Sequence, residues 1–548
     1  MHFLKPNSYY AYYSFWRNLS KGFDRSVGGI PFTEEGCPLK LDRSSTMYAT
    51  LLLTGTGLFS QVLGFFYRIA LSRLIGAEIM GLYQLVMPVY FLLLSIVSSG
   101  LSTAVSTLSA EYHALGRYDS IRQTLRRCLL IFFMMAIPLA LLTALASDFI
   151  SVYFLGDART QLGLILLAPC LLLTGVENLH KHSFYGTGNV RPAALTELCE
   201  QVIRTCAVLG LLLCFLPQYP ERVVGLIVVG MVICEVFSSM TLVILFRRHM
   251  IHRGKLAPSA PIPTGRIASI AIPVGLTAVL NNLMGSATSV MIPQRLVAGG
   301  ASVSEAMSSF GVLCGMTIPL LNMPTALMGA MCLIMVPKLA ESNTLGNIAA
   351  IRRRLDRAIT VTGVLIIPAM ALLVVVGPTL GQLLYSEATV GHYMLPLSLA
   401  LLLTCYQGVL ASALNGINKQ GAAARNAVIS NALELILTWY TVGIPSVGLG
   451  GYVFAFLISA ALGLLLNIIS TVRATGLPLR LRQWVLSPGL ASLFSALWVN
   501  LLFRRMTAAD TSPTLSIALC LVVGFILYVA VLRIQGVRLQ KLFRFSKS

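Results

Sequence analysis

Three charged residues lie at helical spacing inside an apolar segment of the chain. Glu197, Glu200 and Arg204 are three and four positions apart, which places them on one helical face with the acids on the favourable N-terminal side of the base. Arg204 is about eleven residues into the segment, so at about 1.5 Å per residue it lies roughly half-way along a membrane-spanning helix. An ionisable group at that depth costs about 2.5–3.5 kcal/mol. We therefore expect this face to line a polar cavity. The alternative is a neutral Glu200–Arg204 pair that only makes burial tolerable.

Further ionisable side chains lie in other apolar segments. Arg68 and Arg295 are each toward one end of theirs, and arginine suits a pyrophosphate because its planar guanidinium makes two parallel charge-assisted hydrogen bonds. The alternative for both is snorkelling of the guanidinium to lipid headgroups. Glu177, four residues before Lys181, and the isolated Glu235 are carboxylates of the kind that proton or sodium coupling requires.

The composition of the chain excludes a soluble enzyme. Of the 548 residues, 56% are hydrophobic and 11% are charged, whereas a soluble domain carries about 25% charged residues. So few charges cannot cover a compact chain of this size in water. The 11 cysteines include no C-x-x-C pair and none near histidine at zinc spacing, so we expect no metal or redox centre and no cofactor.

Fourteen segments are apolar and long enough to be transmembrane helices, each of which needs about 20 residues. They are residues 47–71, 82–107, 128–147, 161–183, 193–215, 223–246, 267–294, 310–336, 358–380, 393–415, 426–444, 449–470, 484–503 and 514–532. The links between them are too short to fold as a catalytic domain. The sequence thus predicts an all-α polytopic membrane protein with about 14 transmembrane helices.

Basic residues are concentrated in alternate links. One set of links and the two tails hold 32 of the 40 Lys and Arg, against 6 in the opposite set. Because cytoplasmic loops are rich in Lys and Arg, both termini are expected in the cytoplasm. The net charge of +20 is then explained by membrane topology, and we expect no nucleic-acid partner.

The chain repeats itself at an interval of 230 residues. Glu111, Leu115, Gly116, Ile121, Arg122, Leu125 and Arg127 recur as Glu341, Leu345, Gly346, Ile351, Arg352, Leu355 and Arg357. Pro138 and Gly186 recur as Pro368 and Gly416. Six spans per copy give both copies the same orientation, which predicts two parallel six-helix lobes related by a pseudo-twofold axis along the membrane normal. This architecture is typical of a transporter that handles its substrate between the lobes.

At the same interval, Arg204 corresponds to Glu434. Three arrangements of this pair are open: opposite charges facing each other across the cavity, an interlobe salt bridge, and two unrelated sites. Gly311 and Gly315 are spaced for close helix approach, and we expect them to pack within one lobe.

The spans and links divide the chain into six parts. They are an N-terminal cytoplasmic extension (1–46), an N-lobe (47–246), a cytoplasmic interlobe loop (247–266), a C-lobe (267–470), two additional spans (471–532) and a basic cytoplasmic tail (533–548). The extension is rich in tyrosine, serine and charge, and it has no signal-peptide pattern. The alternative to a genuine extension is translation from Met47.

Several N-lobe motifs resemble those of a known transporter family. They are Ser60 to Arg68 (SQVLGFFYR), Ser72 to Ala77 (SRLIGA), Gly81 to Gln84 (GLYQ), Ser109 to Tyr112 (SAEY) and Gly186 to Pro192 (GTGNVRP). On these motifs the chain, from about Met47 onward, is identified as a member of the multidrug/oligosaccharidyl-lipid/polysaccharide exporter superfamily. Within it, the chain resembles the bacterial polysaccharide-biosynthesis group that includes stage V sporulation protein B and the lipid II flippases.

This resemblance implies a flippase of the bacterial plasma membrane that moves an undecaprenyl-pyrophosphate-linked saccharide, such as a peptidoglycan precursor, to the outer leaflet. Its partners are then the lipid-linked saccharide, membrane lipid and a coupling ion, sodium or proton, and a monomer is compatible with the sequence. Where lipid II flippases carry an arginine earlier in the first helix, this chain has Gln61, and its second span lacks the arginine that they place there. Arg68 is the arginine that matches.

Three other functions compete with a flippase. A cation-coupled multidrug exporter of the same fold would suit a cavity dominated by acids. A membrane glycosyltransferase or polymerase would need a large extracytoplasmic loop with acidic catalytic residues, which the short links do not provide, so we expect no enzyme. A structural scaffold would not need charges at the membrane midplane.

Overall fold

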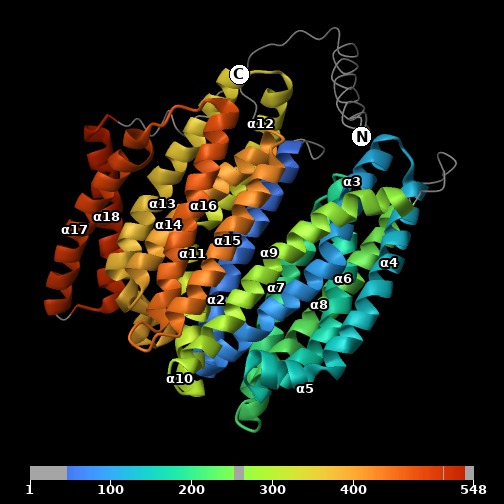
Figure 1. Ribbon diagram of the computed structural model, residues 1–548, viewed down its shortest axis with the longest axis horizontal. Coiled ribbons are helices and arrows are strands. Elements are labelled where there is room, and N and C mark those ends of the chain that lie inside the picture. Colours follow the sequence, from blue (N-terminus) through green and yellow to red (C-terminus); the bar gives the residue numbers. More distant parts are fainter. Residues whose placement is uncertain (1–45, 252–263, 510, 537–548) are drawn as a thin grey trace. The chain divides into compact units, whose positions relative to one another are not determined.

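The computed structural model describes residues 46–251, 264–509 and 511–536. The predicted N-terminal extension, except for its last residue, lies outside these ranges, as do most of the predicted interlobe loop and tail. The chain divides into the units Met1–Tyr48 and Ala49–Ser548, and the description below concerns the second. Its described residues form helices and short connections with no β-strand among them (Figure 1), which confirms an all-α fold.

The helices follow the chain order of the two predicted lobes. The first lobe contains α2 (Thr46–Leu94), η1 (Ser95–Ser99), α3 (Gly100–Ala114), α4 (Tyr118–Leu145), α5 (Ser147–Phe149), η2 (Ile150–Leu155), η3 (Ala158–Thr160), α6 (Gln161–Gly186), α7 (Arg191–Phe215), η4 (Pro220–Arg222) and α8 (Val223–Ile251). The second contains α9 (Thr264–Ala298), α10 (Val303–Phe310), η5 (Gly311–Thr317), α11 (Ile318–Asn322), α12 (Ala326–Thr344), α13 (Ile348–Tyr385), η6 (Ala388–Gly391), α14 (Met394–Gly416), α15 (Gln420–Val442) and α16 (Leu449–Thr475). The remaining elements are η7 (Arg482–Leu486), α17 (Ser487–Ala508) and α18 (Pro513–Ile534).

The predicted spans fall on helices, although their division differs. Within the described ranges, 12 helical stretches are long and apolar enough to cross a membrane. The first, Gly55–Ala114, contains most of the first predicted span and all of the second, because two helices meet directly at Gly76, whose φ of 75° favours glycine. The eleventh predicted span lies on α15, which is not among the 12 because its Asn, Arg and Glu residues lower its hydropathy.

The eighth predicted span, 310–336, is interrupted in the structure. Its helix begins at Val303, passes through the π-helical segment η5 and ends at Asn322. A separate helix, α12, begins at Ala326. Pro324 lies in the break, and a proline, which has no N–H, cannot continue helical hydrogen bonding.

Backbone features recur at the interval of 230 residues that the sequence shows. Gly116 and Gly346 end their helices with φ of 69° and 66°, a region in which glycine is favoured. Gly186 lies against a backbone carbonyl of α3, and Gly416 lies against one of α12. These positions need glycine because of backbone geometry, and both copies of the repeat keep it.

The connection between the third and fourth helices of each lobe also repeats. Gly156 and Ser386 have φ of 78° and 59°. The next residues, Asp157 and Glu387, cap the short helices η3 and η6 by accepting a hydrogen bond from the backbone N–H two positions on, at 2.9 and 3.3 Å. The repeat therefore preserves capping chemistry as well as turn geometry.

A pair of equivalent arginines fixes the last helix of each lobe. Arg122 Nη2 donates to the carbonyl oxygen of Met250 in α8 at 2.5 Å, and Arg352 Nε donates to that of Thr475 in α16 at 2.6 Å. In both lobes the arginine at the start of the third helix thus satisfies a terminal carbonyl of the sixth.

Glycines bring the two lobes into backbone contact. A Cβ on Gly81 of α2 would collide with the carbonyl of Met307 in α10. One on Gly311 would collide with the carbonyl of Ala77, and Gly315 also faces α2. The expectation that Gly311 and Gly315 pack within one lobe is therefore wrong, because the small residues allow the approach of a helix from the other lobe.

Helix α9 contacts both predicted lobes. It packs against α3 and η1 of the first lobe and against α15, α10 and α16 of the second (Figure 1). One interlobe hydrogen bond joins Ser286 Oγ of α9 to the carbonyl oxygen of Pro88 at 2.8 Å. The appended helices α17 and α18 pack against α13, where the Tyr528 hydroxyl donates to the carbonyl oxygen of Val364 at 2.8 Å.

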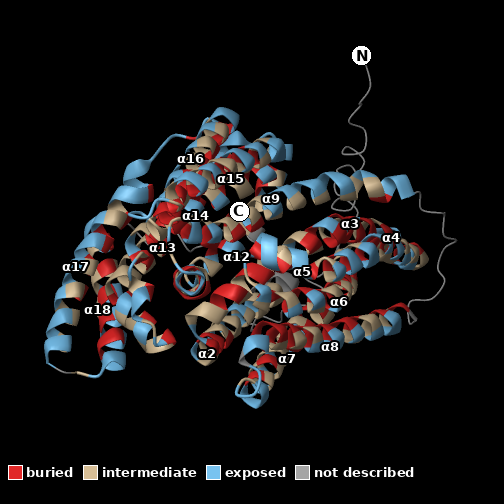
Figure 2. Cartoon of the chain, turned by 60° about the horizontal axis from the view of Figure 1, so that its bottom comes forward, coloured by how far each residue is buried: buried red, intermediate tan, exposed pale blue. Residues whose placement is uncertain are grey.

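Many outward helix faces are apolar. Figure 2 shows exposed residues along the outer faces of the helices and buried ones where helices meet. The exposed set includes large side chains such as Met134, Leu142, Leu493 and Phe525. Apolar side chains on outer surfaces are expected where the surrounding medium is lipid.

We expect Gly81→Ala and Gly311→Ala each to lower the thermal unfolding temperature of the detergent-solubilised protein. Overpacking of this kind costs about 1–3 kcal/mol. Gly210→Ala in α7 is the matched control, because a Cβ there meets no atom within 4 Å. Equal unfolding temperatures for Gly311→Ala and Gly210→Ala would contradict the glycine contact.

Candidate functional site: a buried charge cluster in the N-lobe

Three consecutive long helices bring five ionisable side chains together. The N-lobe cluster comprises Glu177 and Lys181 from α6, Glu200 and Arg204 from α7, and Glu235 from α8. The i, i+4 spacing within α6 and within α7 puts each acid and its base on one helical face. Helix α8 packs against both α6 and α7, which brings the third acid to the same place.

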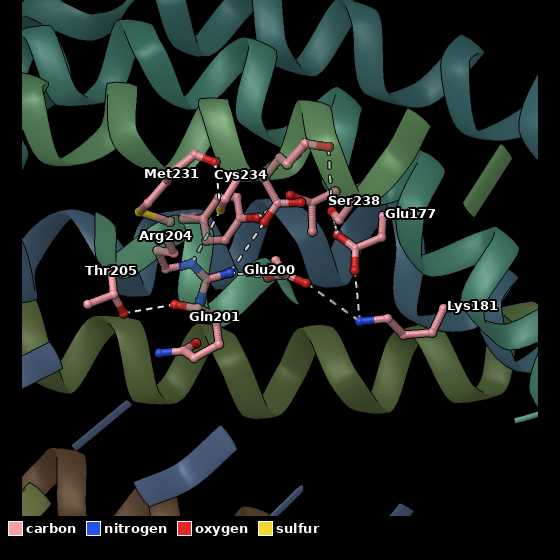
Figure 3. Close-up of polar contacts among 12 residues, drawn as sticks. Glu177, Lys181, Glu200, Gln201, Arg204, Thr205, Met231, Cys234 and Ser238 are labelled. Carbon is pink, nitrogen blue, oxygen red and sulfur yellow. Dashed lines mark hydrogen bonds and ion pairs between the residues drawn. The ribbon is translucent and has the colours of Figure 1, made fainter. Parts of the chain in front are cut away.

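The α6 end of the cluster is fully paired. Lys181 Nζ is 2.7 Å from Glu177 Oε1 and 3.9 Å from Glu200 Oε2. Ser238 Oγ of α8 donates to Glu177 Oε2 at 2.8 Å. Figure 3 shows Lys181 between the two acids, with Ser238 on the far side of Glu177. Both oxygens of the Glu177 carboxylate are therefore satisfied.

Arg204 holds the other end of the cluster. Its guanidinium forms an ion pair with Glu200, and its Nη2 is 3.6 Å from Glu235 Oε1. Its Nε donates to Cys234 Sγ at 3.5 Å. The Arg204 side chain keeps 26% of its surface exposed, against 4% for Glu235, so the base lies at the edge of the cluster and the α8 acid lies inside.

Glu197 is not in contact with this cluster. It lies one turn before Glu200 on α7 and is half-buried. The Glu197 carboxylate attracts Lys181 electrostatically without forming an ion pair with it. The predicted helical face is therefore real, but its N-terminal acid lies at the periphery.

Arg68 shares its surroundings with Arg204. Tyr67 and Tyr83 of α2 interact electrostatically with both arginines. Arg68 also interacts electrostatically with Cys314 and Tyr385 of the C-lobe. No acid in the described part of the chain pairs with it, which leaves a half-buried guanidinium open to an anion from outside the protein.

Arg295 packs against an aromatic ring on another helix of its lobe. Its guanidinium carbon lies 4.5 Å from the centre of the Trp439 ring, a cation–π contact between α9 and α15, and Gly443 lies directly against the same side chain. Arg295 is thus separate from the N-lobe cluster, and sequence spacing contained no signal of its aromatic partner.

Glu434 also lies apart from Arg204. Its Oε2 accepts a hydrogen bond from Ser459 Oγ of α16 at 3.1 Å, whereas Arg204 is paired with acids of its own lobe. Among the described residues there is no Arg204–Glu434 ion pair, so the interlobe salt bridge considered from the sequence is absent there.

The equivalent region of the C-lobe is mostly uncharged. Glu177 and Glu200 correspond to Gln407 and Ser430 at the interval of 230 residues. Asn467 Nδ2 donates to the carbonyl oxygen of Gln407 at 3.2 Å, and Ser430 Oγ donates to that of Ser459 at 2.7 Å. Neutral hydrogen bonds thus replace ion pairs in the second copy.

The C-lobe contains a cavity instead. It has a volume of about 350 Å³ between the broken helix region of α11 and α12 and helix α14. Its lining is mainly apolar, with Asn322, Thr325, Thr404 and Ser412 as polar members. None of the ionisable residues predicted as a site lines it.

Polar contacts also join the lobes at the α10 end. Arg159 Nη2 is 2.7 Å from Glu78 Oε1, and Ser304 Oγ of α10 donates to Glu78 Oε2 at 2.8 Å. Gln294 of α9 donates to the carbonyl oxygen of Phe154 at 2.5 Å. The Ser304–Glu78 and Gln294–Phe154 hydrogen bonds join the first lobe to the second at one end of the helices, and the Arg159–Glu78 ion pair lies within the first lobe.

A membrane-embedded pair of helical repeats with buried charges is the architecture of a transporter. The chain matches the family model described as "Polysaccharide biosynthesis protein" over residues 48–324. It belongs to this family.

Two curated relatives come from Bacillus subtilis (strain 168). Stage V sporulation protein B is 23% identical over 450 residues, which cover 81% of this chain and 87% of that protein. Lipid II flippase MurJ is 24% identical over 423 residues, which cover 72% and 77%. The predicted family, and the prediction of a transporter instead of an enzyme, are confirmed by the family match and these relatives.

Solved structures show the same fold. A lipid II flippase MurJ in an inward closed conformation superimposes with a TM-score of 0.69 at 15% identity, covering 90% of this chain and all of that one. An inward-facing multidrug resistance MATE family transporter of the MOP superfamily gives 0.59 at 15% identity, covering 78% and 99%. The predicted two-lobe exporter fold is confirmed.

We expect Arg204→Gln to destabilise the protein by about 3–5 kcal/mol, because it leaves buried acids without their base. The double variant Glu200→Gln, Arg204→Gln should lose less than the sum of the two single changes. Denaturant unfolding in detergent measures both. Arg126→Gln is the control, since Arg126 is exposed at the start of α4. The same unfolding free energy for Arg204→Gln and Arg126→Gln would show that the ion pairs stabilise nothing.

Proposed function

We propose that this protein is a flippase that carries an undecaprenyl-pyrophosphate-linked saccharide across the bacterial cytoplasmic membrane by alternating access. The saccharide unit is a peptidoglycan precursor of the lipid II type or a related polysaccharide unit. The observation that carries the proposal is Arg68, a half-buried guanidinium without an acidic partner in the described chain. Tyr67 and Tyr83 interact electrostatically with both Arg68 and Arg204.

The chemistry of the substrate fits these two arginines. A pyrophosphate presents paired anionic oxygens, and a guanidinium binds such groups with two parallel charge-assisted hydrogen bonds. Arg68 interacts electrostatically with Tyr67 of the N-lobe and with Cys314 of the C-lobe, so it lies near residues of both lobes. The likeness to a relative named as a lipid II flippase supports a lipid-linked cell-wall saccharide over other anions.

The remaining predicted residues take secondary places in this proposal. Glu200 and Glu235 hold Arg204 in position, and Glu197 lies on the same helical face, one turn before Glu200. Arg295 and Glu434 are proposed to line the substrate cavity from the C-lobe. In the structure each contacts residues of that lobe. Both termini are proposed to be cytoplasmic, from the distribution of basic residues, with the domain limits given by the sequence.

A second candidate is a cation-coupled multidrug exporter of the same fold. It is favoured by the three carboxylates Glu177, Glu200 and Glu235 in one lobe, and by the likeness to multidrug transporters. In the structure, however, Lys181 and Arg204 already pair with these acids. An organic cation would have to displace a base, which makes this candidate the weaker one.

Complementation tests the proposal. We expect the chain to restore growth of a strain depleted of its own lipid II flippase, and headgroup access assays to show the lipid-linked precursor in the outer leaflet. If precursor translocation were unchanged by removal of this protein while efflux of organic cations fell, the multidrug exporter would replace the flippase.

Arg68→Ala should reduce precursor translocation about tenfold or more, because a hydrogen bond to a charged group contributes about 1.5–3 kcal/mol. Arg68→Lys, which keeps the charge but loses the planar fork, should give an intermediate rate. Arg126→Ala is the control for loss of one positive charge. Full translocation by Arg68→Ala would remove the main support for anion binding at this position.

A further inference from the structure

The charges of the N-lobe cluster do not balance. Three acids, Glu177, Glu200 and Glu235, face two bases, Lys181 and Arg204. Glu177, Glu200 and Glu235 are at most 8% exposed, and an uncompensated charge buried among membrane helices costs several kcal/mol. One proton bound by the cluster would restore neutrality.

Other titratable groups around the cluster do not supply the missing positive charge. The groups close enough to interact electrostatically with the cluster come from all four helices packed around it. They are Tyr67, Tyr83 and Tyr90 of α2, Cys170, His182 and Tyr185 of α6, Glu197 of α7 and Cys234 of α8. Tyrosine and cysteine are neutral at neutral pH, and Glu197 adds a negative charge at the periphery. His182 lies near the positively charged Lys181, which disfavours a second positive charge there. Within the described chain, Arg68 is in no ion pair with the three acids, which pair with Lys181 and Arg204.

The proton is best placed on the carboxyl of Glu235. Glu177 is satisfied as a carboxylate by Lys181 and Ser238, and Glu200 is satisfied by Arg204. Glu235 has only the 3.6 Å approach of its Oε1 to Arg204. Its Oε2 is fully buried and receives no hydrogen bond from a donor in the described chain.

A second acid lies against this unsatisfied carboxyl. Ser238, three residues after Glu235 on α8, donates to Glu177 Oε2 and lies against the backbone carbonyl of Glu235, which places the Glu177 carboxylate beside the turn of α8 that carries Glu235. Two neighbouring carboxylates repel, whereas a carboxylic acid donates its O–H to a carboxylate. A proton on Glu235, donated towards Glu177, would remove this repulsion and satisfy the buried Oε2.

A metal ion fits this place less well. Glu200, Cys234 and Glu235 offer one ligand atom each within 4.8 Å of one another. Arg204 already contacts all three of these residues. A cation there would meet the guanidinium at close range, so the positive charge that the cluster can still accept is a proton on the side away from Arg204.

We propose that Glu235 is a proton-binding site, which holds one proton in this structure, donates it in a hydrogen bond to Glu177, and releases it when the lobes rearrange and water reaches the cluster. On release, the Glu235 O–H bond breaks, its electron pair stays on the carboxylate and the proton passes to water. The site itself stands on the geometry alone. Its coupling to transport rests on the proposed flippase function.

Infrared spectroscopy of the purified full-length protein tests the site without any substrate. We expect a carboxylic-acid carbonyl band that shifts in D2O, disappears at high pH and is lost in Glu235→Gln. Glu197→Gln, on the neighbouring helix, should leave this band unchanged. A spectrum of folded Glu235→Gln identical to that of the parent would overturn the proposal, as would saturable loss of the band on adding Na⁺ at constant pH.

A second variant covers the case in which Glu235→Gln does not fold. Ser238→Ala removes the hydroxyl that donates to Glu177, so Glu177 should accept the proton more strongly and the carbonyl band should move in frequency while keeping its intensity. An unmoved band in this variant would contradict proton sharing between the two acids.

Transport in vesicles tests the coupling separately. If the chain is a flippase, translocation of the lipid-linked precursor should respond to a pH gradient in the parent and lose that response in Glu235→Gln. A parent that translocates without any response to the gradient would overturn the coupling. Absence of precursor translocation in every variant, with the infrared band present, would overturn the proposed function and leave the proton site standing.

Discussion

The burial of Arg204 among membrane-spanning helices constrains the whole N-lobe. A guanidinium can lie there only if acids reach it, and the acids come from two helices, Glu200 from α7 and Glu235 from α8. Helix α6 joins them because Lys181 bridges Glu177 and Glu200. The rotation and depth of three helices are therefore tied together by one network of charges, and a shift of any one of them exposes a charge to lipid.

The two lobes share backbone geometry and differ in chemistry. Positive φ angles at Gly116 and Gly346 recur at the repeat interval, because a chain reversal at a helix end imposes the same steric demand in each copy. No such demand fixes the polar side chains of the interior. Arg204 corresponds to Glu434, and hydrogen-bonded neutral groups replace the ion pairs of the first lobe. Charge is thus concentrated on one side of the interlobe contact.

An interior that contains both signs of charge suits the transport of a lipid-linked anion. Arg68 lacks a described acidic partner and is available to phosphate oxygens, whereas the acids behind Arg204 compensate the bases when no anion is present. The polar contact of Glu78 with Ser304 and the glycine contact of α2 with α10 and η5 link the lobes without using Arg68.

The helical fold, the approximate positions of the helices, the duplication and the helical face of Glu200 and Arg204 follow from the sequence, because hydropathy, repetition and i, i+4 spacing are local properties of the chain. Partners on other helices do not follow from it. That Glu235 joins Arg204, that Arg295 stacks on Trp439 and that Gly311 meets the opposite lobe depend on how the helices are rotated and shifted against one another. Those quantities are decided by packing between distant segments, and only the tertiary structure contains them.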